Sequence, residues 1–72
     1  MAALQVHYYE GHRALFWREV HTALKARLNL MIYSGNEERA EYIIRSIRRY
    51  NKRHGIGGFV SRKADLAVVL FL

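Results

Sequence analysis

The sequence contains no cysteine, and its apolar residues never form a long run. Without thiols the fold cannot use disulfides, it lacks the usual ligands of structural zinc, and thiol chemistry is excluded. The longest apolar run, Leu66 to Leu72, is far shorter than the roughly 20 residues of a membrane-spanning helix. The amino terminus also lacks the basic and apolar regions of a signal peptide. The sequence therefore predicts a cytoplasmic protein without a membrane span.

The sequence also lacks the spacing of a metal site. The four histidines, none of which forms an H-x3-H pair or a similar ligand pair, are His7, His12, His21 and His54. We expect them at the surface or half-buried. A small ribonuclease could be built from His54, Tyr50 and nearby cations, because phosphodiester cleavage needs an acid, a base and a positive charge. Such residues occur together in any basic surface, so we predict that the protein is not an enzyme and uses no metal ion or other cofactor.

Acidic residues are missing from one stretch of the chain, from Tyr42 to Lys63. This stretch carries seven of the twelve Lys and Arg residues and no Asp or Glu. Residues 1–41 carry five cations and five anions, and Asp65 follows the stretch. The charges of residues 1–41 cancel, so the seven cations of the stretch and the single negative charge of Asp65 give the formal net charge of +6. Concentrated positive charge predicts a polyanionic partner.

The length of 72 residues indicates a single small domain, residues 1–72. A chain of this size buries only about 60% of the surface that its unfolded form exposes, so its core is marginal. With 51% hydrophobic residues the chain is nevertheless too apolar to be disordered. We therefore predict a folded domain that is stabilised as a homo-oligomer or as a subunit of a complex.

The strongest local pattern predicts an amphipathic helix at about residues 36–54, which we call the basic helix. Its apolar face consists of Ala40, Ile43, Ile44 and Ile47. Ser34 and Glu37 match the S-x-x-E capping box, and Gly55 is placed to end the helix in a left-handed conformation. Both ends of the basic helix are therefore predicted.

A second helix is predicted at about residues 12–33. Its apolar residues recur at spacings of three and four, and they are Phe16, Val20, Leu24, Leu28 and Met31. The short link from Ser34 to Asn36 then predicts an antiparallel helical hairpin. The segment from Asn29 to Tyr33 could instead leave the helix as a strand, because only the continued periodicity favours a helix there.

The two ends of the chain are expected to form strands. Leu4, Val6 and Tyr8 alternate with other residues, as in a short strand with one buried face. The apolar C-terminal segment, 59–72, predicts a strand, a turn and a second strand, or alternatively a third helix that begins at Ser61. We therefore predict an α+β fold in which the helical hairpin packs on a small antiparallel sheet of the N-terminal and C-terminal segments. The alternative is an all-α three-helix bundle.

The cations of the basic helix gather on one of its faces, and they are Arg45, Arg48, Arg49, Lys52 and Arg53. At 100° per residue this face spans about 140° of the helix, and Tyr42 falls within it. The guanidinium fork suits phosphate, and the tyrosine ring suits stacking on a base. Any stable helix favours basic residues in its last turn, but that preference does not explain the mutually repelling Arg45 and Arg49, four residues apart.

We therefore predict a small basic nucleic-acid-binding protein that contacts the phosphate backbone of RNA or DNA with little sequence specificity. The predicted binding residues are Tyr42, Arg45, Arg48, Arg49, Lys52, Arg53, Arg62 and Lys63. The start of the basic helix carries Glu37 and Glu38, which argues against a recognition helix that presents its N-terminal end to the bases.

A protein partner is the alternative. A small protein-binding regulator or inhibitor of the phage or accessory-element type, or an assembly subunit, would dock the same cations on an acidic protein surface. In either case the oligomer or docking surface is predicted at Leu66, Val68, Leu70 and Leu72. The charge pattern does not distinguish RNA, DNA and acidic protein.

Overall fold

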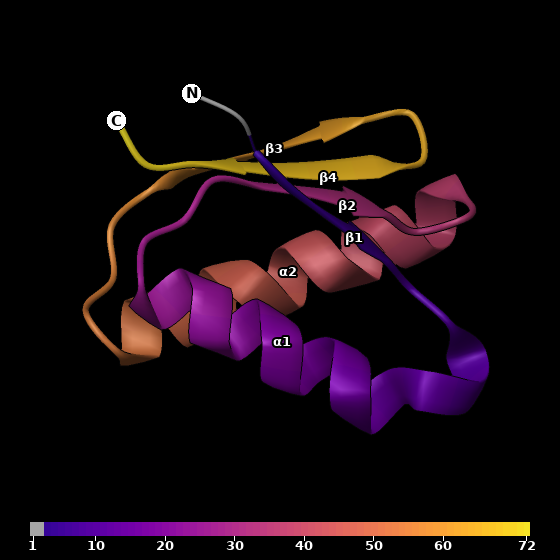
Figure 1. Ribbon diagram of the computed structural model, residues 1–72. Coiled ribbons are helices and arrows are strands. Elements are labelled where there is room, and N and C mark those ends of the chain that lie inside the picture. Colours follow the sequence, from indigo (N-terminus) through magenta and orange to yellow (C-terminus); the bar gives the residue numbers. More distant parts are fainter. Residues whose placement is uncertain (1–2) are drawn as a thin grey trace.

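Two helices cover one face of a four-stranded sheet in the computed structural model, which describes residues 3–72 (Figure 1). The elements in chain order are β1 (Leu4–His7), the 3-10 turn η1 (Glu10–His12), α1 (Arg13–Lys25), β2 (Leu30–Tyr33), α2 (Glu37–Arg53), β3 (Phe59–Lys63) and β4 (Leu66–Leu70). The strand order across the sheet is β1-β2-β4-β3. β1 and β2 are parallel, and β4 is antiparallel to both of its neighbours. The sheet is therefore mixed, with the C-terminal strand in its interior.

This architecture corrects the predicted fold. The chain is α+β, but α1 and α2 do not form a hairpin because β2 separates them. β1 pairs in parallel with β2 instead of joining an antiparallel sheet with the C-terminal segment. Parallel neighbours require a crossover connection, and α1 supplies it between β1 and β2. The alternative three-helix bundle is also wrong, because residues 59–63 and 66–70 form a hairpin of strands.

The helix predicted at 12–33 ends at Lys25. Arg27 adopts a left-handed backbone with φ of 55°, and the Leu28 amide donates to the Ala23 carbonyl at 3.0 Å. Glycine usually occupies the left-handed position after a helix, and because arginine stands there instead, the sequence pattern does not indicate where this helix ends. The chain then continues as β2, as the alternative for Asn29 to Tyr33 had allowed.

The core lies between the helices and the sheet. Its fully buried large side chains include Val20, Leu24, Leu30, Ile32, Ile43, Ile47 and Val69. Strands contribute alternate residues to this core, as expected for a two-layer domain. In residues 3–72 no helix combines the length and the apolar character that crossing a membrane requires.

The face of the sheet away from α1 and α2 carries the predicted docking residues of β4. Leu66, Val68 and Leu70 alternate with the buried Ala67 and Val69, and all three are half-buried. β4 is thus covered by the helices on one face and paired with β2 and β3 at its two edges. Beyond β4, the predicted docking residue Leu72 is fully exposed.

Candidate nucleic-acid interface

Local contacts define the start of α2, the helix that carries most of the predicted binding residues. Asn36 is the N-cap, and its Oδ1 accepts a hydrogen bond from the Arg39 amide at 2.8 Å. The predicted capping box at Ser34 is wrong. Ser34 is buried, and its hydroxyl donates to the backbone carbonyl of Asp65, which ties the start of α2 to the β3–β4 turn.

The end of α2 follows the sequence prediction. Gly55 has φ of 64°, and the Ile56 amide donates to the Asn51 carbonyl at 2.8 Å. Gly58 also occupies a position that requires glycine. Its φ is 131°, and a Cβ there would lie 2.6 Å from the Phe71 ring. The glycines at 55 and 58 therefore serve helix termination and close packing.

Five cations cover the outer side of α2, and we call them the cationic face: Arg45, Arg48, Arg49, Lys52 and Arg53. All five residues are exposed, whereas the apolar side of the helix is buried against the sheet. Neighbours on this face are three or four residues apart, which corresponds to roughly 5–6 Å along the helix. The face therefore presents a dense row of positive charge to solvent.

No carboxylate within residues 3–72 forms an ion pair with the five cations of this face. Within residues 3–72 the ion pairs are Arg39 with Glu10 at 2.6 Å and Arg62 with Glu37 at 3.9 Å. Neither pair includes a residue of the cationic face. Like charges at four-residue spacing destabilise a helix by a few tenths of a kcal/mol per pair. An external anion would relieve this repulsion.

Arg48 differs from the other four cations because it also contacts the sheet. Its Nη2 donates to the backbone carbonyl of Val60 in β3 at 2.9 Å. The residue remains exposed. It therefore marks the boundary between the cationic face and the β3 edge.

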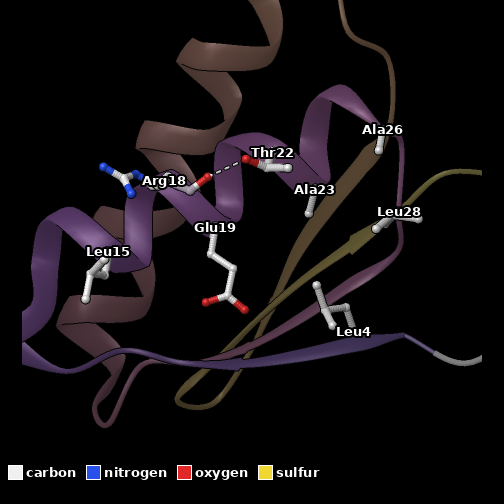
Figure 2. A pocket seen from close by; sticks show the side chains of 8 residues that line it. All are labelled: Leu4, Leu15, Arg18, Glu19, Thr22, Ala23, Ala26 and Leu28. Carbon is white, nitrogen blue, oxygen red and sulfur yellow. Dashed lines mark hydrogen bonds between the residues drawn. The ribbon is translucent and has the colours of Figure 1, made fainter.

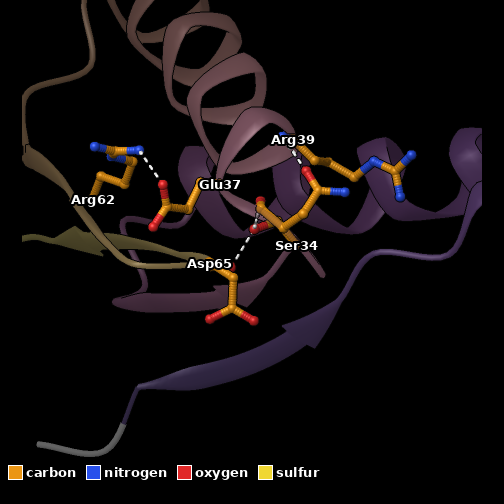
Figure 3. Close-up of polar contacts among 6 residues, drawn as sticks. Ser34, Glu37, Arg39, Arg62 and Asp65 are labelled. Atoms are coloured by element: carbon orange, nitrogen blue, oxygen red, sulfur yellow. Dashed lines mark hydrogen bonds and ion pairs between the residues drawn. The ribbon is translucent and has the colours of Figure 1, made fainter.

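The structure does not bring Arg62 and Lys63 to the cationic face. Val60 is buried beneath the helices, so alternation along β3 directs Arg62 to the helix side and Lys63 to the opposite face of the sheet. Arg62 reaches Glu37, the first residue of α2 (Figure 3). That position is roughly 24 Å along the helix from its last residue. Arg62 and Lys63 therefore follow the cations of α2 closely in the sequence but lie apart from most of them in space.

Tyr42 lies at the border of the cationic face. Its side chain keeps 42% exposure, and its ring meets the Trp17 ring edge-on with centroids 6.3 Å apart. An exposed ring next to Arg45 is suited to stack on an unpaired base. The predicted role of Tyr42 is thus compatible with its position.

A stack of rings that was not predicted from the sequence lies between α1 and α2, and its members are Trp17, His21, Tyr50 and His54. The His21 and Tyr50 rings are nearly parallel, with centroids 4.1 Å apart, and His54 lies 4.3 Å from Tyr50. Burial lowers the pKa of His21, and the positive charges of His54 and Lys25 lower it further. The four-residue spacing within each helix could have indicated this stack, because residues four apart share a helix face.

Comparison with known proteins finds no match for this chain among family models, curated proteins or solved structures. Within the described part of the chain, no three His, Cys, Asp or Glu side chains gather as a metal site would require. The cationic face, with its exposed cations on one side of α2, is the candidate site of the described residues.

Proposed function

We propose that the protein binds nucleic acid through the cationic face of α2 and acts as a binding protein, not as an enzyme. The observation that supports this proposal is a set of four exposed cations on one helix side with no carboxylate in ion-pair contact within residues 3–72. These cations are Arg45, Arg49, Lys52 and Arg53. A phosphate backbone relieves their repulsion, and binding releases its condensed counterions.

The dimensions of the face suit one strand of nucleic acid. Arg45 and Arg53 are eight residues apart, roughly 12 Å along the helix, and one strand of a duplex presents about three or four phosphates over that length. Contacts to phosphate carry no base information, so the proposal implies little sequence specificity. Tyr42 adds one stacking ring, which favours single strands over duplex.

The proposal is tested by titrating fluorescent single-stranded RNA, single-stranded DNA and duplex DNA over a salt series. We expect micromolar or tighter binding at physiological salt, with a log–log salt slope of about −3 to −4 for duplex DNA and about −2 to −3 for the single strands. The Arg49→Glu variant should make the slope less steep by about 1 to 2 and should weaken binding to all sequences.

Lys63→Glu is the matched control, because it changes the net charge equally but lies on the opposite face of the sheet. Its loss of affinity should be much smaller than that of Arg49→Glu. Equal losses would show that only net charge matters and would contradict binding at this face. If none of the three nucleic acids bound at physiological salt, the proposal would be overturned in favour of an acidic protein surface as the partner.

A further inference from the structure

The two edges of the sheet differ in how they are protected against another strand. β3 carries Arg62 and Lys63, and the carbonyl of its Val60 already accepts a hydrogen bond from Arg48. β1, at the other edge, has the sequence Leu-Gln-Val-His and no formal charge. Charged residues and covering side chains are common means of blocking strand addition. By these criteria β3 is a protected edge and β1 is an open one.

β1 directs part of its backbone towards this open edge. The Leu4 amide donates to the Asn29 carbonyl at 2.8 Å, and the Tyr8 amide donates to the Tyr33 carbonyl at 2.9 Å. Alternate residues of a strand direct their amides to the same side, so the amide of Gln5 points to the open edge. A strand added there would form hydrogen bonds without disturbing the β1–β2 ladder.

An apolar groove of about 480 Å³ lies between this open edge and α1 (Figure 2). Leu4, Leu15 and Leu28 line it, and they are 40%, 57% and 48% exposed. Ala23 and Ala26 also line the groove, and such small side chains allow a second helix to approach closely. Apolar side chains surrounded by polar ones are the usual composition of an interface core and its rim.

Two opposite charges in the groove favour a second copy of this chain as the occupant. Arg18 and Glu19 are adjacent in α1, both line the groove, and neither forms an ion pair within residues 3–72. A twofold interface brings the same patch from both copies together, so a contact from residue i to residue j occurs twice. Arg18 can then pair with the partner's Glu19, and Glu19 can pair with the partner's Arg18. A partner of one charge sign would match only one of the two residues.

We propose that the protein forms a twofold-symmetric dimer in which β1 pairs antiparallel with the partner's β1 and α1 packs against the partner's α1. The resulting sheet has eight strands, four from each copy. The symmetry axis is perpendicular to this sheet, so the helices of both copies lie on the same side. Because α2 contacts β3, the two cationic faces lie towards the outer ends of the dimer. The dimer does not depend on nucleic-acid binding.

The mass in solution tests this proposal, measured by light scattering and by sedimentation down to low concentration. At about 100 µM the mass should be twice 8.5 kDa, since a dimer with a micromolar Kd is then almost complete. Gln5→Pro removes an edge amide without removing a β1–β2 hydrogen bond, and it should weaken the dimer about tenfold or more. Val68→Lys is the control, because it lies on the open face of the sheet, and it should leave the dimer unchanged.

A charge swap tests the predicted pairing directly. Arg18→Glu alone should weaken the dimer about tenfold, because it places like charges together. Arg18→Glu with Glu19→Arg should restore the affinity, and helical circular dichroism of both variants checks that each one folds. A monomer at about 100 µM, or a double variant that stays dissociated, would overturn the proposal. A dimer that Val68→Lys disrupts and Gln5→Pro does not would place the interface on the open sheet face and would equally overturn it.

Discussion

The Arg48 side chain donates a hydrogen bond from Nη2 to the backbone carbonyl of Val60, and this 2.9 Å contact joins the middle of α2 to the edge strand β3. The other four cations of the cationic face point to solvent without a partner of this kind in the described residues. One cation therefore has a structural role, and four are available for an external anion. This division leads to different expectations for neighbouring arginines.

Replacing Arg48 with Met should lower the free energy of unfolding by about 1 kcal/mol. The variant keeps much of the aliphatic stem but loses the charged donor of one hydrogen bond. Arg49→Met is the matched control, and its free energy of unfolding should change by less than about 0.5 kcal/mol. Urea denaturation of both variants measures the difference. Equal stabilities would show that the Val60 contact contributes nothing.

Asn36→Ala should cost about 1 kcal/mol, because it removes the side-chain acceptor for the Arg39 amide at the start of α2. Asn36→Asp keeps the acceptor and should retain the stability of the parent protein. Urea denaturation compares the two, and helical circular dichroism reports any loss of the first turn. A fully stable alanine variant would mean that Asn36 is not the effective cap.

Gly58→Ala should cost about 2 kcal/mol or more. Its φ of 131° is unfavourable for any residue with a Cβ, and the new methyl group would lie 2.6 Å from the Phe71 ring. Gly57→Ala is the control, because nothing lies within 4 Å of its Cβ and its φ is not positive. In thermal unfolding, the midpoint temperature of Gly57→Ala should be well above that of Gly58→Ala. The reverse order would contradict the role assigned to Gly58.

The stability should depend on pH through His21. Burial, His54 and Lys25 lower its folded pKa below the ordinary value of 6.5, so the unfolded chain binds more protons between these two values. The stabilising contribution is therefore complete above about pH 6.5 and is lost as the pH falls through the window below it. Urea denaturation from pH 5 to 8 should show this loss in the parent protein and a weaker slope in His21→Gln. The same slope in both proteins would contradict the assignment.

The basic helix could be predicted well because its information is local. α2 spans Glu37–Arg53, close to the predicted 36–54, and its apolar stripe is buried as the helical period indicated. Gly55, which follows the C-cap, adopts the expected left-handed backbone that ends the helix. The Ser34 capping box is wrong because Gly35 has φ of 95°, so the helix cannot begin directly after Ser34 and Asn36 holds the N-cap position instead. The Ser34 hydroxyl bonds the carbonyl of Asp65, which is distant in sequence.

The sheet, in contrast to the basic helix, could be predicted only in part. The alternation at Leu4–His7 and the strand, turn and strand of the C-terminal segment were visible in the sequence, and β3 and β4 do form that hairpin. The pairing of β1 with β2 and of β2 with β4 was not visible. The parallel pairing of Leu4 with Leu30 depends on residues far apart in the chain, and a four-residue strand has little pattern of its own. The helical periodicity at residues 12–33 also did not indicate that α1 ends at Lys25, because the left-handed backbone of Arg27 that follows is rare for a residue with a side chain.

The sequence by itself determined where the positive charge lies, the extent of the basic helix and the apolar side that it buries. These properties follow from contacts within one or two helical turns and from residue identity. Only the tertiary structure decided that β4 is an inner strand, that Arg62 and Lys63 leave the cationic face, and that β1 is an open edge beside an apolar groove. The physical reason is that strand pairing and side-chain neighbours across a sheet join residues distant in sequence, which no local pattern specifies.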